Sequence, residues 1–238
     1  MITAPRISTR SIRTAAGAIL LVESIAVAVL VARSAPEVLP VVTSSGATTF
    51  TVAEVDIGVG VIVPLVLGAL LLLTGAVADP RIRWLESSVS SSIGVFLIAE
   101  LNGIRELGTL VAIYALTSAV ALLGALQEGR RDRPRMLPAV FGAMVGIVPW
   151  GLIAWYEIAP AVATGTVQPG WVRVVTLIML TLFLASAANF WWSSRRIGPW
   201  RRPLVGARLS LLLTVLTRSA LAWLVAGALA SGAASGAV

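Results

Sequence analysis

The chain has 238 residues, of which 58% are hydrophobic and only 12% charged, and its mean hydropathy is +0.94. These values are typical of a polytopic membrane protein and exclude a soluble domain with a large core. Cysteine and histidine are both absent, which excludes disulfides, thiolate catalysis and the usual metal ligands. The net charge of +7 is the balance of 18 arginines against 11 acidic residues, and the chain contains no lysine. In a membrane protein such an excess of positive charge indicates how the chain is oriented in the membrane and that it contacts anionic lipid headgroups. No nucleic-acid partner is expected.

Seven apolar segments are each close to the length of about 20 residues that a hydrocarbon core requires. The first is preceded by arginines, as a signal peptide would be, but no small-residue cleavage pattern follows it, so we expect a retained span. The sequence therefore predicts an all-α, seven-helix transmembrane domain over residues 1–238. The predicted spans are 14–32, 57–78, 84–102, 107–126, 138–158, 171–192 and 207–230.

The arginines divide unevenly between the two sides of this predicted bundle. Three lie on one side, at Arg33, Arg105 and Arg173. By the positive-inside rule, the N-terminus is expected in the cytoplasm and the C-terminus outside the cell membrane. The cytoplasmic set has fourteen members, namely Arg6, Arg10, Arg13, Arg81, Arg83, Arg130, Arg131, Arg133, Arg135, Arg195, Arg196, Arg201, Arg202 and Arg208.

The one long connection joins the first two spans, from Arg33 to about Asp56. It contains two β-branched runs, 41–43 and 48–52, around the turn Ser44-Ser45-Gly46-Ala47. This pattern predicts a short β-hairpin on the outer face, and an irregular loop is the alternative. Because an isolated hairpin is marginal in water, we expect it to pack on the helices or on a second protomer.

The eighteenth arginine, Arg218, lies in the middle of the last apolar segment. With a rise of about 1.5 Å per residue it falls near the bilayer midplane, where an unpaired charge costs on the order of 3 kcal/mol. Glu86 is the first candidate for its partner, because Ser90 follows four residues later and extends a polar face. Glu23 and Glu100 are alternatives, and Glu86 could instead simply face headgroups and water.

Further side chains are candidates for a polar and aromatic pocket around Arg218. Thr214 lies four residues before Arg218 on the same helix face, and Thr117 is a polar candidate in the fourth span. Trp150 follows Pro149 in the fifth span, and Trp223 follows Arg218 by five residues. Both tryptophans could wall a ligand pocket, or serve only in packing or at the membrane interface. No nucleophile with a base and no metal cluster is visible, so we expect neither catalytic nor metal-binding residues, and no enzyme.

Several motifs recur along nearly the whole chain, namely Arg83-Trp84-Leu85-Glu86 with Ser90-Ser91-Ser92, Phe141-Gly142, Gly146-Ile147-Val148-Pro149-Trp150, Ile158-Ala159-Pro160, Pro169-Gly170 and Ser219-Ala220-Leu221-Ala222-Trp223. Together they resemble the heliorhodopsin family. The resemblance implies a seven-helix rhodopsin-like bundle that forms dimers, with Glu86 at the counter-ion position. It also implies that the residue before Ser219 is the one that carries retinal as a Schiff base in the family.

The chain departs from the family at the chromophore anchor, where Arg218 replaces the lysine. A guanidinium stays protonated and forms no retinylidene linkage under ordinary conditions. No other lysine exists, and the family's histidines are also missing, with Leu20 at the position of the first. We therefore expect no covalent retinal, and leave open a non-covalent apolar ligand or lipid.

The sequence thus favours a retinal-free sensor, signalling protein or scaffold in which an Arg218–Glu86 pair replaces the Schiff base and its counter-ion. One alternative is a photoreceptor that binds retinal non-covalently. Another is a small transporter or channel, against which the odd number of spans and the lack of an inverted repeat count. The expected partners are membrane lipids, a second copy of the chain, and a cytoplasmic protein that the sequence does not identify.

Overall fold

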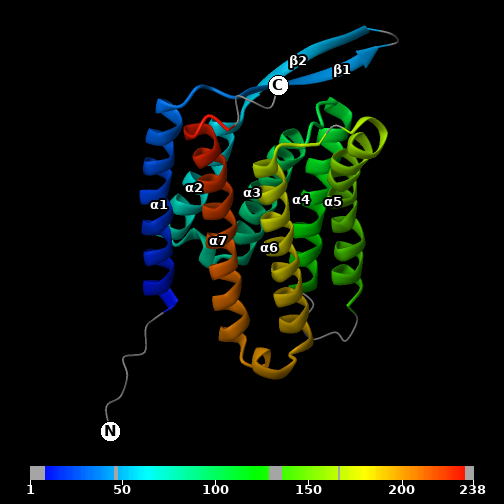
Figure 1. The fold of residues 1–238 in the computed structure, drawn as a ribbon. Coiled ribbons are helices and arrows are strands. Elements are labelled where there is room, and N and C mark those ends of the chain that lie inside the picture. Colours follow the sequence, from blue (N-terminus) through cyan, green and yellow to red (C-terminus); the bar gives the residue numbers. More distant parts are fainter. Residues whose placement is uncertain (1–8, 46–47, 129–135, 166, 234–238) are drawn as a thin grey trace.

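The computed structural model describes residues 9–45, 48–128, 136–165 and 167–233, and within them seven α-helices run side by side with a β-hairpin at one end (Figure 1). The seven-helix fold predicted from the sequence is confirmed. Arg6, Arg130, Arg131, Arg133 and Arg135, which entered the topology argument, lie outside the described residues. The elements are α1 (Thr9–Arg33), β1 (Val38–Ser45), β2 (Thr48–Asp56), α2 (Ile57–Thr74), η1 (Ala76–Ala78), α3 (Pro80–Leu101), α4 (Leu107–Glu128), α5 (Leu137–Thr164), α6 (Gly170–Arg195), η2 (Gly198–Arg201) and α7 (Pro203–Ala230).

Capping residues explain where the predicted boundaries shift. The second span ends at Thr74, earlier than predicted, because Gly75 adopts the left-handed conformation at φ 75° and stops the helix. The third span begins earlier than predicted, at Pro80, because the Asp79 carboxylate accepts the Arg81 N–H at 2.8 Å and proline suits the first helical position.

Within the described residues, six helices are long and apolar enough to cross a membrane, and α3 is the exception. Its charged side chains, which include Glu86 and Glu100, lower its hydropathy below that of the other six. It packs between α2 and α4 and also contacts α5 and α6, so these neighbours shield it. The helix with the weakest hydropathy signal therefore lies inside the bundle and carries five of the twelve buried polar or charged residues in the described part of the chain, more than any other helix.

The predicted hairpin is confirmed and is longer than expected, with Val38 opposite Asp56 and a bulge between Val41 and Val42. Its turn residues Gly46 and Ala47 lie outside the described residues. Leu39 and Val41 of β1 are buried, whereas most of β2 is exposed. The Val42 N–H donates to the Arg105 carbonyl at 2.8 Å, which ties β1 to the turn between α3 and α4. The hairpin therefore packs on the bundle through β1 and extends past it in Figure 1.

Candidate functional site

Arg218 is buried in the middle of α7, with only 8% of its surface exposed. Its Nη2 donates to Oε1 of Glu86, which is 7% exposed, and the two side chains form an ion pair. The structure thus brings together the two residues that the sequence predicted as partners. The pair joins α7 to α3 across 132 positions of the chain.

Ser90 completes the environment of the Glu86 carboxylate. Its hydroxyl donates to the same Oε1 at 2.8 Å, one helical turn further along α3, and it is itself buried. One carboxylate oxygen therefore accepts from both the guanidinium and a hydroxyl. Burial of a charge is tolerated only with such pairing and hydrogen bonding, and here both conditions are met.

A glycine makes room for the guanidinium on α2. A Cβ atom built at Gly68 would overlap Nη1 of Arg218, so no side chain fits at this position while Arg218 keeps its place. The same built atom would lie 3.2 Å from Cδ1 of Leu20, which is fully buried on α1. Sequence reasoning missed Gly68, because small residues in membrane helices usually indicate only close helix packing.

A second carboxylate is bound next to the ion pair. The hydroxyl of Ser219 donates to Oε2 of Glu23 at 2.5 Å, which links α7 to α1. Glu23 was an alternative partner of Arg218, and it contacts the neighbouring residue instead. Adjacent residues of α7 therefore bind carboxylates on two different helices.

The third candidate acid, Glu100, lies far along α3 from the pair and is fully buried. Neither of its carboxylate oxygens has a hydrogen-bond partner within the described part of the chain. Beyond the end of α3, burial lowers the pKa of the Arg105 guanidinium, while the carboxylates of Glu100 and Glu37 act in the opposite direction. The charged groups beneath the hairpin thus form a separate cluster from Glu86 and Arg218.

The other predicted pocket residues are placed unevenly. Thr117 is buried, but its hydroxyl donates to the Ile113 carbonyl at 2.8 Å within α4. Thr214 is only partly buried and likewise donates to the carbonyl of Ser210 on its own helix, at 2.9 Å. Neither hydroxyl is among the hydrogen-bond donors to Glu86 within the described residues. Both hydroxyls therefore donate within their own helices.

The two tryptophans differ. Trp150 is buried on α5, with its ring centroid 5.6 Å from that of Phe183. Trp223 is 43% exposed, which favours the alternative of a packing or membrane-interface residue over that of a pocket wall. The reason is helical geometry, because five residues correspond to roughly 500°, or 140° beyond a full turn. Trp223 therefore points away from the face that carries Arg218.

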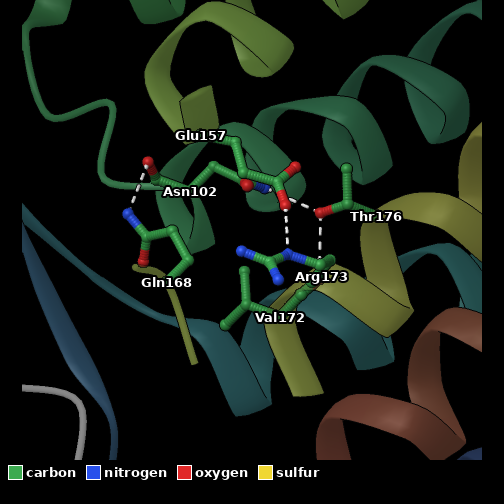
Figure 2. A network of polar contacts seen from close by, with 6 residues as sticks. All are labelled: Asn102, Glu157, Gln168, Val172, Arg173 and Thr176. Atoms are coloured by element: carbon green, nitrogen blue, oxygen red, sulfur yellow. Dashed lines mark hydrogen bonds and ion pairs between the residues drawn. The ribbon is translucent and has the colours of Figure 1, made fainter. Parts of the chain in front are cut away.

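Two polar clusters elsewhere were not anticipated. At the end opposite the hairpin, Arg83 and the Trp84 indole both donate to Oε2 of Glu128, at 2.7 and 2.6 Å, and join α3 to α4. At the hairpin end, the Asn102 amide donates to the Thr176 hydroxyl at 2.8 Å, and Gln168 donates to the Asn102 carbonyl at 3.2 Å (Figure 2). These contacts fix α3 against α4 and α6 at its two ends.

Two cavities lie near the surface of the bundle. One, of about 220 Å³, is lined by residues that include Val55, Gly60 and Tyr114, and the other, of about 280 Å³, lies beside Trp155 and Pro160. Arg218 lines neither. Among the described residues, no group of three acidic side chains is placed to hold a metal ion. The buried pair of Arg218 and Glu86 therefore lies outside both cavities.

A model of the heliorhodopsin family matches residues 6–229. A search of the curated proteins finds no match. The match spans all seven helices and includes both members of the ion pair, and it agrees with a helical bundle in which at least six helices are apolar enough to cross a membrane. The chain is a multi-pass membrane protein and belongs to the heliorhodopsin family.

Proposed function

We propose that this protein is a retinal-free sensor or scaffold of the heliorhodopsin family, in which Arg218 takes the place of the protonated Schiff base. The single observation that carries the proposal is the buried ion pair between Arg218 and Glu86. A Schiff-base nitrogen can lose its proton, whereas a guanidinium remains protonated in proteins. Arg218 and Glu86 therefore neutralise each other's charge in the interior without a chromophore.

The residues around position 218 do not fit covalent retinal. A guanidinium offers no amine that condenses to a stable retinylidene linkage, and Nη1 of Arg218 fills the space beside Gly68. Nη2 is held by the counter-ion itself. A non-covalent apolar ligand or a lipid is compatible with this chemistry. A signal would then come from a bound molecule or a partner protein and not from light absorbed by a linked chromophore.

The test is the variant Arg218→Lys, because it restores an amine beside a retained carboxylate. With all-trans retinal supplied, we expect the variant to form a visible pigment that borohydride bleaches, while the parent protein stays colourless. A coloured parent that resists borohydride would contradict the proposal and favour non-covalent retinal. A folded lysine variant without colour would indicate that the pocket has closed, which leaves a scaffold as the function.

We further infer a homodimer that forms through the hairpin, with the hairpin on the outer side of the membrane. An exposed strand presents unpaired backbone groups to a neighbour, and β2 also exposes Phe50 and Val52. The arginine distribution supports this orientation. Since the chain has no cysteine, single cysteines report on both inferences.

We expect Phe50→Cys to be cross-linked to its copy by a short bismaleimide, and Val167→Cys, exposed at the same end, to be cross-linked far less. Both should react with a membrane-impermeant maleimide on intact cells. Equal cross-linking at the two positions would contradict the hairpin interface. Protection of both positions on intact cells, with labelling after lysis, would contradict the orientation.

A further inference from the structure

We propose that the turn between α6 and α7 binds the headgroup of an anionic phospholipid. Its four arginines, Arg195, Arg196, Arg201 and Arg202, are all exposed. None of the four forms an ion pair within the described part of the chain, although one, Arg195, lies 5.1 Å above the ring of Trp191. Four positive charges within eight residues repel one another, and a bound anion relieves this repulsion. Such an anion must come from outside the turn.

The described part of the chain supplies little negative charge near this turn. No aspartate or glutamate occurs anywhere between residues 158 and 238. At the same end of the bundle, the Asp79 carboxylate caps α3, and the Glu128 carboxylate is held by Arg83 and Trp84. These two acids are therefore engaged elsewhere. The turn, at the base of α6 and α7 in Figure 1, is basic without a described internal counter-charge.

Hydrogen bonds and ring contacts hold the turn in one shape. The Trp200 indole donates to the Asn189 side chain at 2.8 Å, and the Asn189 amide donates to the Gly206 carbonyl at 3.3 Å. The rings of Trp200 and Trp192 lie 4.8 Å apart. A rigid site loses less entropy when it binds a ligand than a flexible one does. The arginines thus project from a fixed scaffold.

The surroundings favour a lipid over a free phosphate ion. Trp192 is 42% exposed, and Ile197 is also exposed beside the arginines. Tryptophan is enriched at the level of the lipid headgroups, where an indole contacts both acyl chains and water. Arginine binds phosphate oxygens through paired N–H donors. The turn therefore offers donors for a phosphate next to apolar surface for the attached chains.

The start of α7 adds to this attraction. Arg202 precedes Pro203 at the first helical position, and no side chain caps this end of α7. The partial positive charge of a helix N-terminus, here of a 28-residue helix, remains available to an anion. It lies beside two of the four arginines.

The experiment uses the full-length protein in nanodiscs of phosphatidylcholine with a minor fraction of phosphatidylglycerol. Spin-labelled analogues of the two lipids measure the preference for phosphatidylglycerol at the protein surface. We expect the parent to prefer the anionic lipid, and the variant Arg201→Gln/Arg202→Gln to lose about thirtyfold of that preference, from the contribution of two arginines near a surface. The matched control Arg10→Gln/Arg81→Gln removes the same charge at the same end and should lose much less.

A second variant separates binding from folding. Arg196 adopts the left-handed conformation at φ 52°, which glycine adopts without strain. Arg196→Gly should therefore keep the fold and still weaken the preference roughly fivefold.

Three results would overturn the proposal. The first is an equal loss in the Arg10/Arg81 control, which would indicate diffuse surface charge. The second is displacement of the lipid by inorganic phosphate at constant ionic strength, which would indicate a free-anion site. The third is a parent protein with no preference for phosphatidylglycerol.

Discussion

The most direct test of the buried pair is a double-mutant cycle with Arg218→Met and Glu86→Gln. Both side chains are less than a tenth exposed, so either single change leaves a buried polar or charged group without its partner. At a separation of about 4 Å and an effective dielectric constant of about 20, two unit charges attract by about 4 kcal/mol. This agrees with the cost of about 3–5 kcal/mol that follows removal of one member of a buried pair.

The double variant should therefore lose far less than the sum of the two single losses. We expect a coupling energy of about 3 kcal/mol, at the upper end of what contacting residues show. Reversible unfolding in mixed micelles of increasing SDS content measures it, with the tryptophan fluorescence and the helical circular dichroism as two independent signals.

The chain contains a matched control for this cycle. Arg173 and Glu157 form an ion pair of 2.8 Å at the surface, where the arginine side chain is 44% exposed. Water screens such a pair, and its coupling should be about 0–1 kcal/mol. If Arg173→Met and Glu157→Gln gave the same coupling as the buried pair, or if the buried pair gave less than this control, the assignment of Glu86 as the stabilising partner would be refuted.

Two further predictions follow from the packing and the charges. Gly68→Ala should displace the Arg218 guanidinium and destabilise the protein, whereas Gly151→Ala, where a Cβ atom has nothing within 4 Å, should be neutral or stabilising. The loss of stability from Gly68→Ala should be smaller in an Arg218→Ala background. Unfolding in SDS measures the two glycine variants, Arg218→Ala and the double variant. The Glu106 carboxylate accepts hydrogen bonds from the N–H groups of Thr109 and Gly108, and these bonds lower its pKa. The stabilisation that this cap contributes to folding is therefore present above the pKa of the unfolded chain, and it is lost as the pH falls through the lower pKa of the folded state. Hydrogen exchange at Gly108 and Thr109 should therefore accelerate in Glu106→Ala at neutral pH and not in the exposed-site control Glu54→Ala; equal rates in the two would contradict the capping role.

The fold and the central pair were predictable because each rests on a strong physical constraint. Span length fixes the helices, and a charge in the membrane interior requires a partner, which limited Arg218 to three acids. The choice among the three rested on the extra hydroxyl of Ser90. The position of α3 inside the bundle also follows from this constraint, since a helix with several charged groups is stable only where others shield it.

The rest of the site depends on how helices face one another, which a single sequence does not encode locally. The exposure of Trp223 depends on its angle around α7 as well as on its distance along the chain from Arg218. The space at Gly68 depends on how closely α2 approaches α7. The contact of Trp200 with Asn189 depends on the backbone conformation of the short turn between α6 and α7. Each is a property of two elements packed together.

The space at Gly68 also restricts the order in which substitutions can accumulate in such a chain. Arginine fits at position 218 only when position 68 has no side chain, whereas lysine, with a single terminal nitrogen, lacks the Nη1 atom that occupies this space. A lineage that exchanges lysine for arginine therefore passes most easily through glycine at position 68 first. Once the guanidinium is in place, a side chain at position 68 must displace it, so we expect glycine at position 68 wherever arginine occupies position 218.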